Sequence, residues 1–144
     1  MPIFATQSRE QLRHAYLDAW QRARTGQLLS PLDRQIATVV EQHPEYHRWL
    51  ERGDAALVED FEPERGAINP FLHLGMHLAI REQVGTDRPA GIRGIHAGLT
   101  LREGDLLVAE HHMMEALGEA LWTAQRSGTE PDEQAYLERR RRLL

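Results

Sequence analysis

Three segments of this sequence each place two potential metal ligands four residues apart in apolar surroundings. The pairs are His43 and His47, His73 and His77, and His111 and Glu115. In an α-helix, residues i and i+4 lie about 40° apart around the axis and one turn above each other, so both side chains can reach one ion or two adjacent ions. The spacing therefore predicts helices that carry metal ligands.

Apolar residues recur with the period of α-helices along most of the chain, and no segment shows the alternation of a β-strand. Helices are predicted at residues 8–26, from residue 31 onward, at 70–84, from residue 89 onward, at 104–128 and at 131–143, with a short helical piece at 55–61. The predicted fold is an all-α, single-domain helical bundle of five or six helices spanning residues 1–144.

Capping residues and prolines indicate where several of these helices begin or break. Ser30-Pro31 and Asn69-Pro70 each pair an N-cap residue with a proline in the first turn. Pro44 removes one backbone hydrogen bond, so the second helix is expected to kink or restart at the histidine pair. The basic run Arg139 to Arg142 fits the C-terminal end of the last helix.

The predicted inward faces of two helices contain candidate ligands. In the helix over 70–84, His73 and His77 share a face with Met76, Ile80 and Val84. The inward face of the helix over 104–128 is expected to contain Leu107, Val108, His111, Met114, Glu115, Gly118 and Trp122. In contrast, His14 lies on the polar side of the first helix, and His96 is expected to be a structural histidine.

Composition limits the kinds of site and protein that the sequence can form. Zero cysteines exclude disulfides, thiolate metal sites and iron–sulfur clusters, which leaves imidazole and carboxylate as ligands. A chain with 41% apolar and 27% charged residues is typical of a globular protein, and no apolar stretch reaches the ~20 residues of a membrane span. No secretory signal is visible, so a cytoplasmic location is expected. The net charge of −5 argues against a nucleic-acid partner.

The imidazoles and the carboxylate on the predicted inward faces all need hydrogen-bond partners or a metal ion. A single buried histidine is ordinary when its ring nitrogens are hydrogen-bonded, but each unsatisfied buried polar group costs about 1–3 kcal/mol. Either these side chains hydrogen-bond with one another and with nearby tyrosines and tryptophans, or a metal ion takes their lone pairs. Because helical bundles build metal sites from inward-facing His and Glu residues, the metal site is the favoured hypothesis.

The ligand types also narrow the choice of metal. Imidazole and carboxylate suit iron, zinc, manganese or copper better than calcium or magnesium. The prediction is a mononuclear or dinuclear non-haem site, with iron or zinc preferred, formed by His43, His47, His73, His77, His111 and Glu115. If the protein is an enzyme, the metal would activate water or oxygen or act as a Lewis acid, with Glu115 as ligand or base. The alternative is a metal-free interaction or structural protein with a buried histidine hydrogen-bond network.

Four segments together resemble a known bacterial family. They are NPFLHLGMHLAIREQ at 69–83, TDRPAGI at 86–92, AEHHMME at 109–115 and EALWTAQRSG at 119–128. The sequence is similar, over nearly its whole length, to the domain-of-unknown-function family number 1841, which implies no activity and no catalytic residues. A weaker resemblance links the His73/His77 and His111/Glu115 pairs to hemerythrin-like metal-binding bundles, without the order and spacing of that family.

Overall fold

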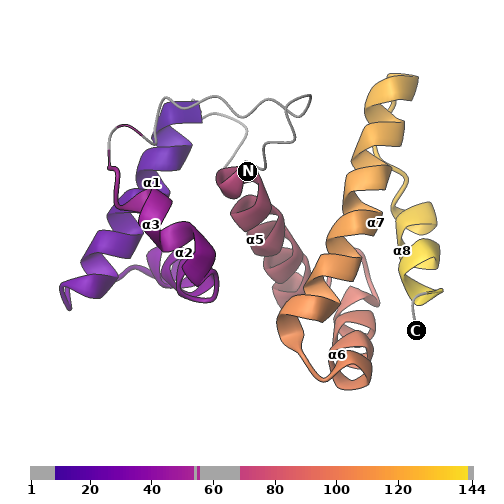
Figure 1. The fold of residues 1–144 in the computed structure, drawn as a ribbon. Helices are drawn as coiled ribbons and strands as arrows, with labels where there is room; N and C mark the ends of the chain where they lie inside the picture. Colours follow the sequence, from indigo (N-terminus) through magenta and orange to yellow (C-terminus); the bar gives the residue numbers. More distant parts are fainter. Residues whose placement is uncertain (1–8, 54, 56–68, 143–144) are drawn as a thin grey trace. The chain divides into compact units, whose positions relative to one another are not determined.

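The computed structural model describes residues 9–53, 55 and 69–142, and within them the chain is all-helical (Figure 1). The helices are α1 (Arg9–Arg24), α2 (Pro31–Glu41), α3 (His47–Leu50), α5 (Pro70–Thr86), α6 (Ile92–Glu103), α7 (Leu106–Ser127) and α8 (Glu133–Arg141), with a 3-10 turn, η1 (Pro44–Tyr46), before α3. The all-α prediction is confirmed, although the described residues form seven α-helices rather than five or six. The predicted helical piece at 55–61 lies almost wholly outside the described residues.

Local capping chemistry explains where the helices begin. The Ser30 hydroxyl accepts a hydrogen bond from the Asp33 backbone N–H at 3.1 Å, which satisfies one of the free donors in the first turn of α2. The Asn69 side chain does the same for α5, since its Oδ1 accepts from the N–H groups of Phe71 and Leu72 at 3.0 and 3.2 Å. Both predicted starts are therefore confirmed.

Pro44 accounts for part of the difference in the number of helices. Helix α2 ends at Glu41, η1 follows from Pro44, and α3 restarts the chain as a helix at His47. A proline lacks the N–H that an interior helical residue donates, so the backbone passes through the tighter 3-10 turn at this point. The predicted restart at the histidine pair is confirmed, and it leaves His43 and His47 on opposite sides of the turn.

Helix α6 begins later than the sequence predicts, at Ile92 rather than near residue 89. The Asp87 carboxylate accepts hydrogen bonds from the backbone N–H groups of Gly91 and Arg93 at 3.2 and 3.0 Å. Gly91 has a φ of 98°, a left-handed conformation that glycine adopts without steric penalty. The segment from Asp87 to Gly91 is therefore a side-chain-bridged turn that precedes the helix.

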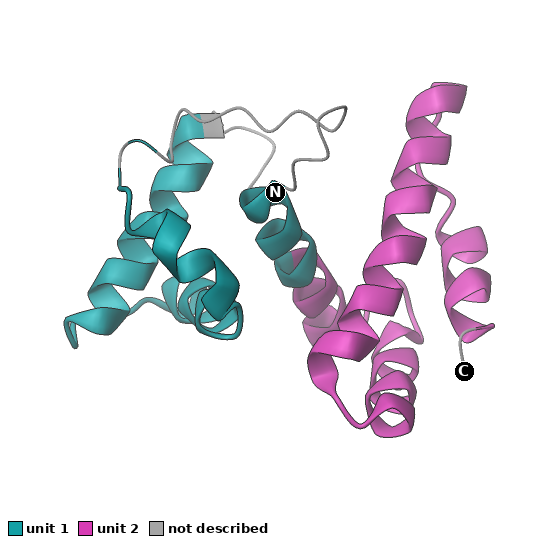
Figure 2. Cartoon of the chain, in the orientation of Figure 1, with its two compact units in different colours: residues 1–78 teal, residues 79–144 magenta. Residues whose placement is uncertain are grey.

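The chain divides into two compact units, residues 1–78 and 79–144, with the boundary inside α5 (Figure 2). In the first unit, α1, α2 and the start of α5 share one apolar core. Its members are Tyr16, Leu17, Ala19, Ile36, Val39, Val40, Leu50, Phe71, Leu74 and Leu78, with Trp20, Tyr46 and Trp49 packed against them. That a single domain comprises both units stays a prediction.

The second unit has its own buried apolar residues, on α5, α6, α7 and α8. They include Ile80, Ile92, Ile95, Leu99, Ala109, Met113, Met114, Ala116, Leu117, Ala124, Tyr136 and Leu137. Among the described helices, none combines the length and apolar character needed to cross a membrane.

One charged side chain of α8 is completely buried in the second unit. The Arg140 guanidinium lies over the Tyr136 ring at 3.5 Å, and its Nη2 donates to the Met113 carbonyl at 3.1 Å. Its Nε and Nη1 atoms have no hydrogen-bond partner among the described residues. Burial lowers the pKa of Arg140 to about 9, because the charged form is poorly solvated there.

Candidate metal centre

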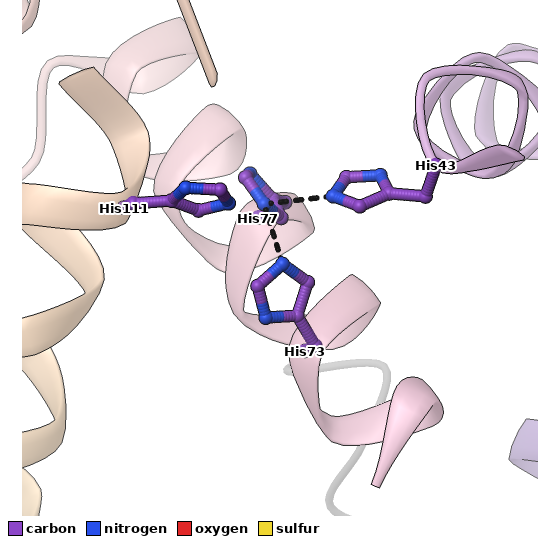
Figure 3. Close-up of side chains that lie close together, drawn as sticks. All are labelled: His43, His73, His77 and His111. Carbon is purple, nitrogen blue, oxygen red and sulfur yellow. Dashed lines mark hydrogen bonds between the residues drawn. The ribbon is translucent and has the colours of Figure 1, made fainter. Parts of the chain in front are cut away.

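Three histidines of the first unit bring their rings together (Figure 3). His43 lies between α2 and η1, whereas His73 and His77 stand one turn apart on α5. His77 has no exposed surface, His43 is 2% exposed, and His73 is half-buried. The ligand pair of α5 thus meets a third imidazole from a segment more than thirty residues earlier in the chain.

The ring nitrogens converge on His77. Its Nε2 atom lies 3.2 Å from Nε2 of His43 and 3.2 Å from Nε2 of His73. Each of the three histidines also offers a ring nitrogen within 4.8 Å of one from each of the others. A tetrahedral ion with metal–nitrogen bonds of about 2.0–2.1 Å separates its ligand nitrogens by about 3.3–3.4 Å. The two observed nitrogen–nitrogen distances are therefore close to the distance between two ligand nitrogens of a tetrahedral ion.

Hydrogen bonding to the backbone fixes the tautomer of His43. Its Nδ1 lies 2.7 Å from the Val39 carbonyl oxygen, which only accepts, so Nδ1 carries the hydrogen and donates it. In the neutral ring, Nε2 then presents a lone pair toward His77. Metal-binding histidines commonly show this arrangement, in which a carbonyl holds one ring nitrogen and so orients the other.

The two approaches to His77 Nε2 cannot both be well-directed hydrogen bonds. A neutral imidazole nitrogen offers, in the ring plane, either one hydrogen or one lone pair. His77 Nε2 therefore forms one well-directed hydrogen bond at most, although two nitrogens approach it at 3.2 Å. A cation among the three rings would instead accept one lone pair from each of them.

Tyr46 packs against two of the three rings. Its ring is stacked parallel to that of His43, with a centroid distance of 5.7 Å and an interplanar angle of 3°. It also meets the His73 ring edge-on at 5.9 Å. Burial, and secondarily the negative charge of Glu45, raises the pKa of the Tyr46 phenol above its ordinary value, so the phenol is neutral at pH 7. Tyr46 lies within the His43–His47 segment, and this position in the sequence could have indicated its contact with the cluster.

His47 is not one of the converging rings. Its Nε2 lies 2.8 Å from the Val40 carbonyl oxygen and therefore donates to it. Its ring packs on Trp20 with a centroid distance of 4.3 Å. The structure thus brings His43 together with His73 and His77, while His47 links α3 to the end of α2.

The two candidate ligands of α7 belong to the second unit, and both side chains are exposed. Figure 3 also draws His111. The face of α7 that is buried differs from the predicted one, since Val108 and Trp122 are 40% and 58% exposed. Glu110, rather than Glu115, is the buried carboxylate of this helix. The ligand roles of His111 and Glu115 remain predictions.

Glu110 forms the centre of a buried charge cluster that the sequence analysis missed. Both of its carboxylate oxygens accept from the Arg81 guanidinium at 2.9–3.1 Å, and its Oε2 lies 3.2 Å from His96 Nε2. Glu110 is 0% exposed, so these partners supply the charge-assisted hydrogen bonds that its burial requires. His96 therefore has a structural partner, as was expected of it.

Comparison with known proteins identifies the family of this chain but indicates no activity. A family model described as a domain of unknown function, DUF1841, matches residues 8–142. The chain belongs to this family. No curated protein and no solved structure matches the chain.

Proposed function

We propose that this DUF1841 protein binds a transition-metal ion through the imidazoles of His43, His73 and His77. The observation that carries the proposal is the position of His77 Nε2, which is 3.2 Å from the Nε2 atoms of both other histidines. A neutral hydrogen-bond network satisfies only one of these approaches well, whereas an ion uses all three lone pairs. Three nitrogens so close together fit one ion better than two.

The donor set supports iron or zinc as the metal. Among the described residues, the group contains imidazole nitrogens and no carboxylate oxygen. Calcium and magnesium prefer oxygen ligands, whereas imidazole suits zinc, iron, copper and nickel. The Val39 carbonyl, which holds Nδ1 of His43, supports either metal by orienting that ligand and raising its basicity.

His111 is proposed as a further ligand. The support for this ligand is its spacing four residues before Glu115 on α7, a spacing that places two potential ligands one helical turn apart. Glu115 and His47 have less support, because Nε2 of His47 is engaged by the Val40 carbonyl and Glu115 is exposed.

Two variants and an untagged protein test the proposal. The full chain without a histidine tag should contain about one equivalent of iron or zinc, and a chelator should lower its melting temperature until metal is restored. His77→Ala should abolish metal binding, because His77 is the ligand that the other two approach. His14→Ala is the matched control: His14 is exposed on α1, and its loss should change stability by no more than about 0.5 kcal/mol.

Two results would count against the metal site. Parent-like metal content in His77→Ala would show that the ion is held elsewhere. A loss of stability in that variant, with no metal in any of the proteins and no response to added metal, would favour the alternative of a metal-free protein. In that case the three rings form a buried hydrogen-bond network, and function would have to lie on the surface.

A further inference from the structure

Two carbonyl groups at the end of α2 lack the N–H groups that a continuing helix would offer them. In an α-helix the Val39 carbonyl would accept from the N–H of residue 43, and the Val40 carbonyl from that of residue 44. Residue 44 is a proline without an N–H, and the His43 N–H donates to the Val40 oxygen instead, at 3.0 Å. Both valines are 0% exposed, so their carbonyl oxygens depend on donors from the protein.

The two imidazoles of the His43–His47 segment supply these donors. Nδ1 of His43 donates to the Val39 oxygen at 2.7 Å, and Nε2 of His47 donates to the Val40 oxygen at 2.8 Å. The His47 ring thus bonds the carbonyl to which Pro44 has no N–H to donate. The four-residue spacing of the two histidines therefore corresponds to two adjacent backbone carbonyls.

His47 also connects this turn to α1. Its ring packs on Trp20 of α1 with a centroid distance of 4.3 Å and an interplanar angle of 35°. Since α1 and α2 pack against each other, the ring contact and the hydrogen bond hold His47 against two helices of the first unit. His47 directly follows η1, so holding its side chain restricts the movement of η1 relative to the end of α2.

The direction of the His43 ring depends on the same turn. His43 is the residue at which the backbone leaves the helix, since its φ of −123° and ψ of 66° are not helical. The Tyr46 N–H donates back to its carbonyl oxygen at 2.9 Å, which closes the turn. With the turn held at both ends, Nε2 of His43 stands 3.2 Å from Nε2 of His77.

We propose that His47 is a positioning residue of the metal site and not one of its ligands. Its hydrogen bond to Val40 and its contact with Trp20 hold η1 in place. The held turn in its place directs His43 toward His77. This inference rests on the proposed metal site and assigns a role to a histidine that the site itself does not use. Replacing groups that orient metal ligands commonly weakens metal binding about 10–100-fold.

Two substitutions separate the hydrogen bond of His47 from its ring. His47→Gln keeps an N–H donor close to the position of Nε2, whereas His47→Phe keeps a ring against Trp20 and removes the donor. Circular dichroism checks the folding of each variant, and His47→Leu, which also lacks the donor, replaces His47→Phe if that variant does not fold.

Cobalt(II) is the probe metal, because its visible absorption bands report the geometry of its ligands. In the untagged full chain, His47→Phe should bind cobalt about tenfold more weakly than the parent and shift the bands. His47→Gln should stay within about threefold of the parent and keep the bands of the parent. The control is His14→Phe, at an exposed position of α1, which should change neither the affinity nor the bands.

A measurement without metal separates failure of this inference from failure of the metal site. Nitrogen-15 NMR of the histidine rings shows which ring nitrogen carries the hydrogen, and in His43 this is Nδ1. At about pH 8.5, above the ordinary histidine pKa, His47→Phe should give a mixture of the two His43 tautomers. His47→Gln should retain the Nδ1–H form.

Three results would overturn the inference. Cobalt affinity, bands and a His43 tautomer like those of the parent in His47→Phe would show that His47 does not position His43. Loss of cobalt binding in His47→Gln as complete as in His77→Ala would make His47 a ligand. If the parent binds no metal, the metal site fails, and an unchanged His43 tautomer in His47→Phe would remove the positioning role as well. A changed tautomer in a protein without metal would support the role of His47, and only the metal site would fail.

Discussion

The hydroxyl oxygen of Tyr16 lies 3.3 Å from the point where a Cβ atom would stand on Gly75. Tyr16 comes from α1 and is 4% exposed, while Gly75 lies on α5 midway between His73 and His77. The absence of a side chain at Gly75 thus lets α1 approach α5 closely beside the candidate ligands. Because α1 also packs on α2, which leads into His43, this contact bears on the geometry of the cluster.

Gly75→Ala is expected to destabilise the protein, although alanine is the better helix former. The gain in helix propensity is about 0.5–1 kcal/mol, whereas forcing an extra methyl group into a packed site costs about 1–3 kcal/mol. The free energy of unfolding, measured by urea denaturation, should therefore fall by about 0–2.5 kcal/mol. If metal binds, its affinity should fall too.

Two further variants isolate this contact. In a Tyr16→Phe background, which lacks the hydroxyl, Gly75→Ala should lose its penalty and become neutral or stabilising. Gly85→Ala, on the same helix with no atom within 4 Å of the added Cβ, should not destabilise. Equal effects of the two alanine substitutions would show that the Tyr16 contact is unimportant.

Tyr16 should also make stability depend on alkaline pH. Burial raises the pKa of its phenol above the ordinary value, so the folded protein keeps this proton at pH values where the unfolded chain releases it. The stabilising contribution is therefore fully present below about pH 10 and is lost as the pH rises above it. Urea denaturation between about pH 8 and pH 11 should show a shallower decline in Tyr16→Phe than in the parent. Parallel declines would contradict this assignment.

Removing Arg81 should be far more damaging than removing an exposed arginine. Arg81→Met leaves the fully buried Glu110 without its bidentate partner, which costs about 3–5 kcal/mol. Arg139→Met is the control, because the Arg139–Glu119 pair is about half exposed and should contribute no more than about 1 kcal/mol. Thermal and urea unfolding would measure both. The double variant Arg81→Met/Glu110→Leu should recover much of the loss, since no buried charge remains unpaired.

In contrast to the replacement of Arg81, replacement of Arg140 should not destabilise the protein. Its two unpartnered nitrogens, Nε and Nη1, each cost about 1–3 kcal/mol, which offsets the hydrogen bond to Met113 and the contact with Tyr136. Arg140→Met is therefore expected to be neutral or slightly stabilising in urea denaturation. Arg141→Met, at an exposed position beside it, should stay within about 0.5 kcal/mol of the parent. A loss above about 2 kcal/mol in Arg140→Met would mean that the guanidinium has a stronger partner.

The sequence alone determined the features that depend on neighbours along the chain. The caps of Ser30 and Asn69, the break at Pro44 and the i, i+4 spacing of His73 and His77 involve atoms within one or two helical turns. Their geometry follows from backbone dihedral angles and free N–H groups, which local sequence controls. These elements, and with them the all-α class, were therefore predictable.

Tertiary structure decided which side chains meet. His43 and His47 were equally good ligand candidates in the sequence. Packing of α2 against α5 places His43 next to His77. His47 instead packs on Trp20 and donates a hydrogen bond to the Val40 carbonyl. Apolar residues lie around more than one side of α7, so its wheel favoured Glu115, whereas contact with Arg81 and His96 selected Glu110 for burial. Partners supplied by other helices set these outcomes, and the periodicity of a single helix contains no information about them.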